Sequence, residues 1–202
     1  MARYHHGDLR AALIDAGMEL ARVNGPGALG IRELARAVGV SPNAAYRHFT
    51  GLRALVLTVA QEAQHRLSRT ILDRSRTIPA DADPPDRAVA TLRAFALGYI
   101  DFALRQPGWF ALTCESQEAP PDPDPDPPPS PHDLLLAALD DMVVTGAMPP
   151  DRRPDAEWAC WSTAHGFALL ATNGPLQGTD RATATRLAER AVTTLIRGLD
   201  AR

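Results

Sequence analysis

The chain of 202 residues contains no lysine, so its 21 basic residues are all arginine. Aromatic residues amount to only 5%, and there are two cysteines, Cys114 and Cys160. The cysteines lie far apart in the sequence and lack the close spacing of a metal-binding motif. We therefore expect two reduced thiols in the core of a cytoplasmic protein, and no metal site.

Long apolar runs are also missing. No stretch approaches the ~18 consecutive apolar residues that a membrane-spanning helix requires, and residues 1–10 contain no apolar segment of the signal-peptide kind. The alternating pattern of half-buried strands does not persist anywhere. Hydrophobic residues nevertheless make up 45% of the chain, chiefly alanine and leucine, which favour helices. The composition predicts an all-α protein with a substantial core and no membrane partner.

The formal net charge of −3 hides an asymmetry along the chain. Residues 1–70 hold nine arginines against five acidic residues, a net charge of +4; the remainder holds twelve against nineteen, a net charge of −7. A basic N-terminal segment on an acidic body indicates a polyanionic partner for that segment. An ordinary solvated charge pattern explains the same counts equally well, so charge alone does not decide.

Helical periodicity recurs along the chain and is divided by start and stop signals such as Asn24-Gly25 and Ser41-Pro42. The predicted helices cover residues 8–24, 31–38, 42–49, 52–75, 88–105, 109–116, 132–146, 154–173 and 180–200. A Pro/Asp linker is expected at 77–86. The run APPDPDPDPPPSP, residues 119–131, predicts a mobile, acidic, extended loop to which no role can be assigned.

Residues 25–30 read GPGALG, which matches the G-x-G-x-x-G pattern of dinucleotide-binding loops. That pattern holds a cofactor only where a strand precedes it within a parallel sheet. Here a predicted helix precedes it, and the following segment is too short for a βαβ crossover. We interpret Gly25 as a helix end, Pro26-Gly27 as a turn and Gly30 as the next helix start, and we predict no cofactor.

Two short predicted helices flank a tight turn at Gly39-Val40-Ser41, the arrangement of a helix-turn-helix motif over residues 30–49. Leu34 and Ala35 are expected to pack inward, while Phe49 anchors the far end of the second helix. Helical enzymes also contain such αα-corners, so the spacing by itself does not establish DNA binding.

The outward positions of the second helix suit a DNA major groove. Asparagine pairs bidentately with adenine, arginine reaches guanine or phosphate, and alanine or proline meets thymine methyl groups. Tyrosine and histidine supply donors at the height of the phosphates. These positions are Pro42, Asn43, Ala44, Tyr46, Arg47 and His48. The alternative is a solvated helix with one satisfied aromatic residue.

Residues 39–55, GVSPNAAYRHFTGLRAL, are similar to the G-V-S-x-x-x-x-Y-x-H-F-x-x-K-x-x-L pattern of the TetR family of transcriptional regulators. The resemblance extends over residues 8–60. The opening RYHHGDLRAAL and the C-terminal Trp161, His165 and Gly166 resemble a subgroup named for a Trp-His-Gly (WHG) ligand-binding domain.

The resemblance implies a three-helix helix-turn-helix DNA-binding domain, residues 1–60, followed by a larger helical ligand-binding and dimerisation domain, residues 61–202. It implies a homodimer that binds a palindromic double-stranded DNA operator as a repressor and is released by a small, lipophilic effector. The DNA-binding residues that the motif and the resemblance imply are Gly30, Arg32, Ser41, Pro42, Asn43, Ala44, Tyr46, Arg47, His48, Thr50 and Arg53. Arg3, Tyr4 and His5 are expected either to form an arm that reaches into the DNA or to be disordered.

Two positions depart from the family pattern. Leu52 stands where the family has a phosphate-binding Lys, and Gly30 stands where it has Ser or Thr. Backbone amides at these two helix N-termini can still bind phosphate, and Arg32, Thr50 and Arg53 lie near enough to substitute.

The last two predicted helices carry apolar stripes on which a second copy could pack to form a four-helix bundle. The same stripes could instead face the core of the monomer, and the sequence does not separate these alternatives. The residues that we assign to the dimer interface are Trp158, Ala164, Ala168, Leu187, Ala191, Val192, Leu195 and Leu199.

Aromatic and polar residues mix on the inward faces of the C-terminal helices, where about a third of them are expected to line an effector pocket. The candidates are Phe95, Tyr99, Phe102, Trp109, Phe110, Cys114, Met142, Trp161 and His165. Ser162 beside His165 suggests an all-α hydrolase, but no acidic residue at helical spacing orients the histidine, so we predict no enzyme. A constitutive regulator that dimerises without a ligand is the other alternative.

Overall fold

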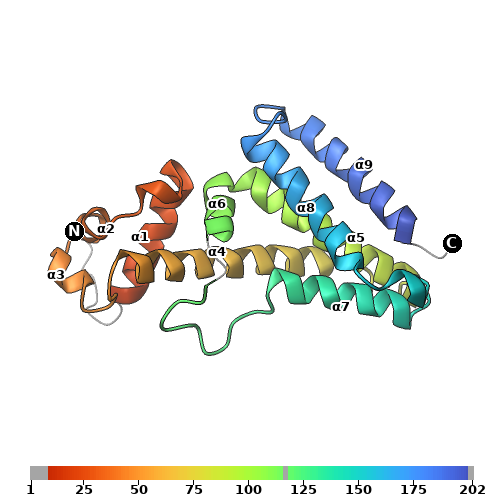
Figure 1. Cartoon of the computed structure of the whole chain (residues 1–202), viewed down its shortest axis with the longest axis horizontal. Coiled ribbons are helices and arrows are strands. Elements are labelled where there is room, and N and C mark those ends of the chain that lie inside the picture. The colour runs from red at the N-terminus through yellow and green to blue at the C-terminus, as the bar shows by residue number, and fades with distance from the viewer. Residues whose placement is uncertain (1–8, 116–117, 200–202) are drawn as a thin grey trace. The chain divides into compact units, whose positions relative to one another are not determined.

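The computed structural model describes residues 9–115 and 118–199, and within these ranges the fold is all-helical. Its α helices follow one another in chain order and are labelled in Figure 1. They are α1 (Leu9–Asn24), α2 (Ile31–Val38), α3 (Pro42–Ala45), α4 (Leu52–Ser75), α5 (Pro84–Arg105), α6 (Pro107–Glu115), α7 (Pro131–Val144), α8 (Ala156–Asn173) and α9 (Arg181–Leu199). Two 3₁₀ turns, η1 (Pro26–Ala28) and η2 (Pro150–Arg152), complete the elements. Among the helices described, none has the length and apolar character needed to span a membrane.

The chain divides into two compact units. Unit 1 comprises residues 1–65 and 106–127, and unit 2 comprises residues 66–105 and 128–202. These units do not follow the boundary predicted after residue 60, because α6 and the acidic loop after it pack with the N-terminal helices. Helix α4 contributes its first turns to unit 1 and its last turns to unit 2.

The core of unit 1 is built from α1, α2, α3, α6 and the first part of α4. Leu13, Leu34 and Val59 are completely buried in it. Gly17 lets α1 cross α4 closely, since a Cβ at that position would lie 2.7 Å from Val59 Cγ2. The helices of the predicted DNA-binding motif therefore rest on a rigid, well-packed base.

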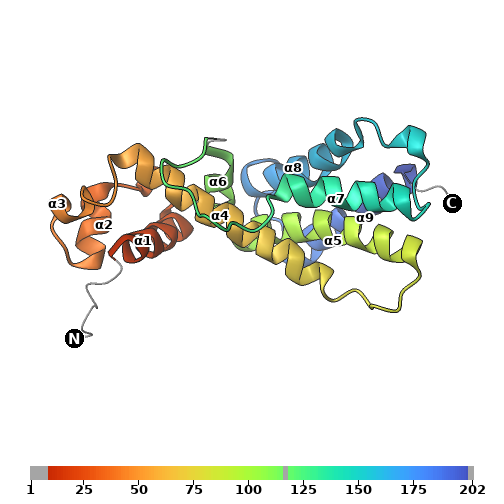
Figure 2. The same cartoon turned by 90° about the horizontal axis from the view of Figure 1, so that it is seen from below.

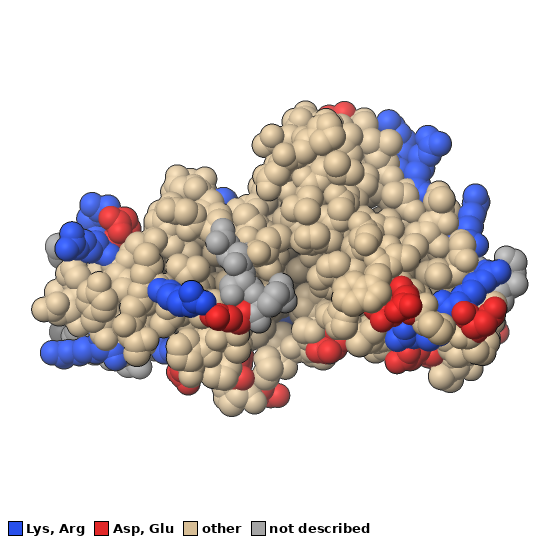
Figure 3. Space-filling model, in the orientation of Figure 1, with Lys and Arg blue, Asp and Glu red and all other residues tan. Residues whose placement is uncertain are grey.

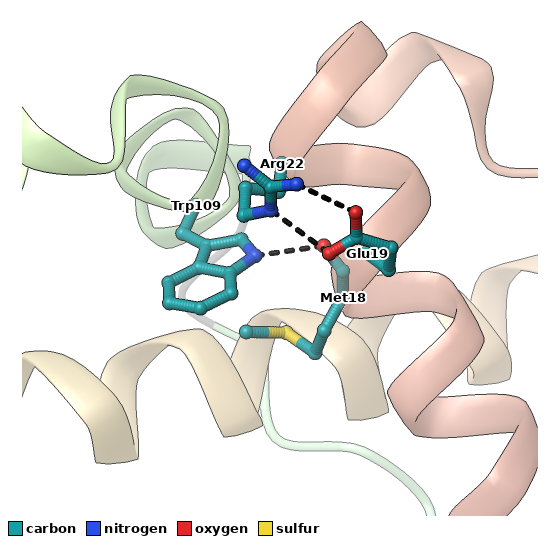
Figure 4. Close-up of polar contacts among 4 residues, drawn as sticks. All are labelled: Met18, Glu19, Arg22 and Trp109. Carbon is teal, nitrogen blue, oxygen red and sulfur yellow. Dashed lines mark hydrogen bonds and ion pairs between the residues drawn. The ribbon is translucent and has the colours of Figure 1, made fainter.

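Helix α6 is joined to α1 by a hydrogen bond and by close backbone packing (Figure 4). The indole Nε1–H of Trp109 donates to the carbonyl oxygen of Met18 at 2.7 Å. A Cβ on Gly108 would overlap the carbonyl oxygen of Ala21, so the first turn of α6 can approach α1 this closely only with glycine there. This contact explains why α6 belongs to unit 1.

Helix α5 is the central helix of unit 2 and packs against α7, α8 and α9 (Figure 2). Every residue of the run 94–100 in α5 is buried, as expected of a helix that is covered on all sides. Gly98 allows the later turns of α4 to approach, since a Cβ there would lie 3.2 Å from the Cα of Ile71. Unit 2 is therefore a helical bundle organised around α5.

Several predicted boundaries need correction. Helix α5 begins at Pro84 rather than at residue 88, because proline is well tolerated in the first helical turn, where the amide needs no intrahelical acceptor. Helix α3 ends at Ala45 rather than near Thr50, because the amides of Arg47 and His48 both donate to i−3 carbonyl oxygens, as in turns, and not to i−4 oxygens. The chain from residue 46 to 48 continues as turns.

The two cysteines differ in their surroundings. Cys160 is completely buried, as predicted, and burial raises the pKa of its thiol to about 12. Cys114 is exposed on α6, so its placement in the core was wrong. The neighbours of Cys114 in α6, Phe110 and Leu112, occupy the buried face instead.

Candidate nucleic-acid interface

Gly25 and Gly39 each end a helix in a conformation with positive φ, which favours glycine. At the end of α2, the amide of Val40 donates to Ala35 O at 2.8 Å and that of Gly39 donates to Arg36 O at 3.2 Å. This is a Schellman motif, and it turns the chain sharply toward α3. Gly25 donates to Ala21 O and closes α1, so the GPGALG segment is a helix end, a 3₁₀ turn and a helix start, as interpreted.

Helix α3 starts at Pro42 and is capped by Ser41. Ser41 Oγ accepts a hydrogen bond from the amide of Ala44 at 3.3 Å, and Pro42 occupies the first helical position. Proline loses nothing there, because the first amides of a helix have no intrahelical acceptor. Residues 41 and 42 thus fix the start and direction of the short helix.

The segment after the turn has one buried and one exposed face. Ala45 and Phe49 are buried, at 2% and 4% exposure, and pack into the core of unit 1. The opposite face is open, with Tyr46 55% exposed. The remaining exposed side chains on it are Pro42, Asn43, Arg47 and His48, and Ala44 is half-buried. The structure thus leaves the predicted outward residues accessible to solvent, with Ala44 the least exposed of them.

Basic groups predominate around this surface. Arg32 and Arg36 of α2 are exposed beside it, against a single exposed acidic residue of that helix, Glu33. Figure 3 shows more Arg than Asp or Glu side chains in the region where Figure 1 labels α2 and α3. A surface of this kind attracts a polyanion and offers hydrogen-bond donors to its phosphates.

Two of the predicted phosphate contacts have an acidic side chain against them. A Cβ on Gly30 would overlap Glu33 Oε2, so the carboxylate of Glu33 folds back over the start of α2. Arg53 donates two hydrogen bonds to Glu118, from Nη2 at 2.5 Å and from Nε at 3.2 Å. The hydrogen bond and the charge of Glu118 raise the pKa of Arg53. Thr50 is exposed nearby.

Arg10 is a further cation that the acidic loop contacts, and it was not among the predicted residues. Arg10 Nη2 lies 3.1 Å from the carbonyl oxygen of Asp122 and 3.3 Å from its carboxylate. No local pattern could reveal this, since the two residues are 112 positions apart. The predicted arm, Arg3, Tyr4 and His5, lies outside the described residues.

Two family models match the chain, one in its N-terminal part and the other in its C-terminal part. The model described as "Bacterial regulatory proteins, tetR family" matches residues 13–59, which include the helix-turn-helix. The model described as "Tetracyclin repressor-like, C-terminal domain" matches residues 92–195, more than half of the chain. The chain belongs to the TetR family. It is a transcriptional regulator with an N-terminal DNA-binding domain and a helical C-terminal domain.

Solved structures agree with this TetR fold. A protein of unknown function from Rhodococcus sp. RHA1 is 26% identical, with a TM-score of 0.77 over 99% of this chain and 100% of that one. A tetR-family regulatory protein from Rhodococcus RHA1 is 20% identical, with a TM-score of 0.57 over 95% and 97%. A TetR variant from Acinetobacter baumannii AYE in complex with minocycline is 18% identical, with a TM-score of 0.53 over 94% of each chain. Among curated protein sequences, no relative matches the chain.

In this TetR-family chain the nine effector-pocket candidates fall in both units. Trp109, Phe110 and Cys114 belong to α6 and therefore to unit 1. The other six, in unit 2, are Phe95, Tyr99, Phe102, Met142, Trp161 and His165. The nine candidates therefore come from two compact units, six of them from unit 2.

Three of the unit 2 candidates contact one another. The hydroxyl of Tyr99 lies 2.8 Å from Nδ1 of His165, and burial lowers the pKa of that histidine. Trp161 stacks on the imidazole of His165 and meets the ring of Tyr99 edge-on. A cavity of about 40 Å³ lies between α5 and α9, and none of the six candidates lines it.

The surface predicted for dimerisation also needs correction. Ala164, Ala168, Val192 and Leu199 are buried within the single chain, because these faces of α8 and α9 pack into unit 2. Of the other candidates, Trp158 is 60% exposed and Leu187, Ala191 and Leu195 are half-buried. Leu169 and Leu170 of α8 are exposed apolar residues that were missed. The spacing of Leu169 from Trp158, three helical turns, was the available signal.

Proposed function

We propose that this TetR-family regulator is a cytoplasmic homodimer that binds a palindromic operator and represses transcription until a small lipophilic effector releases it. The observation that carries the proposal is the division of one short segment into two faces. Asn43, Tyr46 and Arg47 are exposed together, while Phe49 is 4% exposed behind them. An αα-corner with only a structural role does not require these exposed polar side chains.

Each exposed side chain has a role that its chemistry suits. Asn43 would pair with an adenine and Arg47 with a guanine or a phosphate, while Pro42 and Ala44 would meet thymine methyl groups. Further groups would position the duplex through its phosphates. These are Gly30, Arg32, Ser41, Tyr46, His48, Thr50 and Arg53.

Dimerisation would place two α3 segments about one DNA turn (~34 Å) apart, in successive major grooves of a palindrome. The side chains available for the interface are the outward ones of α8 and α9. Trp158, Leu169 and Leu170 expose apolar surface on α8, and Leu187, Ala191 and Leu195 remain half-exposed on α9. Burying such a patch against its twofold copy would stabilise the dimer.

Release by an effector requires the ligand to favour a dimer state in which the two α3 segments no longer match the operator. Support comes from the TetR variant of A. baumannii, which is described in complex with minocycline. Trp161, His165 and Gly166 are the residues that suit membership of the Trp-His-Gly (WHG) subgroup, and we propose that their surroundings, with Tyr99, recognise the effector.

A constitutive regulator without a ligand is the second candidate. The cavity between α5 and α9, of about 40 Å³, is far below the roughly 300–1,000 Å³ typical of ligand sites, so that cavity is too small to hold an effector. A thermal-shift screen against lipophilic compounds separates the two candidates, because an effector that binds the folded state raises the melting temperature. A response to none of the compounds would favour the constitutive regulator.

DNA binding is tested by selecting duplexes from a random library with the purified protein. We expect recovery of a palindrome, and we expect Asn43→Ala and Arg47→Ala each to weaken binding by about 1–3 kcal/mol and to relax the preference at single bases. Arg87→Ala is the control, because Arg87 is an exposed arginine of α5 in unit 2, a helix outside the proposed interface. Failure to enrich any sequence, or equal losses in all three variants, would refute this role for residues 42–48.

A further inference from the structure

The acidic loop after α6 is paired with basic residues of the DNA-binding unit. Glu118 accepts both hydrogen bonds of Arg53, the second residue of α4. Asp122 pairs with Arg10 at 3.3 Å. Asp124 Oδ2 lies 3.8 Å from Nδ1 of His65. All six residues belong to unit 1, so these contacts lie within one compact unit.

Both arginines are adjacent to the proposed recognition segment. Arg53 follows Thr50 and Gly51 at the start of α4, where the family motif has its phosphate-binding Lys one residue earlier. The guanidinium of Arg10 lies 5.6 Å from the ring centre of Phe49, the buried anchor of that segment. The loop carboxylates therefore form ion pairs with arginines that lie beside the surface that a duplex would contact.

The loop is held by charge more than by packing. Of residues 118–127, only Pro120 is buried. Two cavities lie between the loop and the helices beneath it. The first, about 260 Å³, lies over α1 and α4, and the second, about 180 Å³, lies over α4. A segment with so little buried apolar area loses few packing contacts when it lifts away.

We propose that residues 118–127 are an internal competitor for DNA phosphates, which lowers DNA affinity until a duplex displaces them. The inference rests on the proposed DNA-binding function. Carboxylates on Arg53 and Arg10 stand where phosphate oxygens would, and a phosphate and a carboxylate cannot both take the same guanidinium donors. Binding of DNA then releases the loop, whose freed carboxylates take up counterions.

This exchange has a measurable signature in salt. A phosphate contact with a free arginine releases about one counterion, so the slope of log K against log salt changes by about 0.9 per contact. In the wild type, the phosphate must first displace Glu118 from Arg53. The freed carboxylate then takes up a cation from solution, which offsets most of the counterion release from the DNA. Removing the charge of Glu118 should therefore both tighten binding and steepen the slope.

Glu118→Gln and Asp126→Asn form a matched pair for the experiment. Each removes one negative charge from the same loop, but Asp126 makes no ion pair among the described residues. Binding to a mixed-sequence duplex is measured by fluorescence anisotropy across a range of salt concentrations, since the phosphate contribution does not depend on sequence. We expect Glu118→Gln to bind about two- to fivefold more tightly at low salt, the range for an exposed ion pair, and Asp126→Asn to resemble the wild type.

A double-mutant cycle ties the effect to the pair. In an Arg53→Ala background, Glu118→Gln should leave affinity unchanged, because the guanidinium that it would free is gone. Equal gains from Glu118→Gln and Asp126→Asn, or a gain that persists without Arg53, would overturn the inference while leaving DNA binding intact. If no variant, wild type included, bound DNA even at low salt, the proposed function itself would fail.

Discussion

The indole N–H of Trp109 donates a hydrogen bond to the backbone carbonyl oxygen of Met18 at 2.7 Å and thereby joins α6 to α1 (Figure 4). Beside it, Arg22 donates two hydrogen bonds to Glu19, which lowers the pKa of that carboxylate. Helix α6 follows the matched N-terminal family model by almost fifty positions, yet it packs as part of the unit that contains α2 and α3. A change that moves α6 should therefore also displace the helices of the DNA-binding motif.

Replacing Trp109 by Phe should lower the free energy of unfolding by about 0.5–1.5 kcal/mol, the net value of one hydrogen bond. The measurement is urea unfolding followed by far-UV circular dichroism. Tyr46→Phe is the control, because it also removes one polar group from an aromatic ring but from an exposed one. A loss in the control as large as that of Trp109→Phe would contradict the assigned role of the indole.

Replacing Gly108 by Ala should destabilise unit 1 by about 1–3 kcal/mol, because the new methyl group overlaps the backbone of Ala21 and forces α6 away from α1. Gly27→Ala is the matched control: a Cβ there meets nothing within 4 Å, so a change of about 0.5 kcal/mol or less is expected. Thermal unfolding of both variants compares the two sites. Equal stability of the two variants would show that the close approach is unimportant.

Tyr46 and Phe49 lie three residues apart, and replacing each should have a different effect: one on DNA binding and the other on folding. Phe49→Ala leaves a cavity in the core of unit 1 and should cost about 3–5 kcal/mol of folding free energy. Tyr46→Ala should leave the fold almost unchanged and weaken DNA binding about two- to tenfold, as loss of one hydrogen bond would. Chemical unfolding and duplex titration together test both. A Tyr46 variant that unfolds readily but binds DNA normally would exclude its assignment to the DNA-facing surface.

The half-buried His165 should make unit 2 less stable in acid. Its folded pKa is lowered from 6.5 by burial, so the unfolded state binds protons more readily. The contribution of neutral His165 to the free energy of unfolding is complete above pH 6.5, and it is lost as the pH falls through that value toward the folded pKa. His165→Gln removes this titration and should flatten the decline of melting temperature between about pH 7 and 5. An unchanged profile in the variant would assign the decline to other groups.

Leu169 is exposed on α8, so Leu169→Arg should weaken self-association without unfolding the chain. Light scattering should give a lower mass at a concentration where the wild type is a dimer, and operator binding should weaken with it. Val144→Arg is the control, since Val144 of α7 is an even more exposed apolar residue outside the proposed interface. Loss of the dimer in the control alone would move the interface to α7.

Local signals in the sequence were sufficient for much of the helix-turn-helix. Gly39 and Ser41-Pro42 mark a helix end and a helix start through backbone geometry that involves only neighbouring residues. The periodic burial of Leu34, Ala45 and Phe49 follows from the helical repeat itself. For the same reason the outward residues of the segment 42–48 could be named without coordinates.

Contacts between distant segments decided the rest. Trp109 and Met18 are 91 positions apart, Arg53 and Glu118 are 65 apart, and neither pair leaves a trace in local periodicity. The apolar stripes of α8 and α9 could face either the chain's own core or a second copy, and only packing against α5 settled which of their residues are buried. Which elements exist is determined by propensities and caps over a few residues, whereas the partner of each face depends on the free energy of burying it in the whole fold.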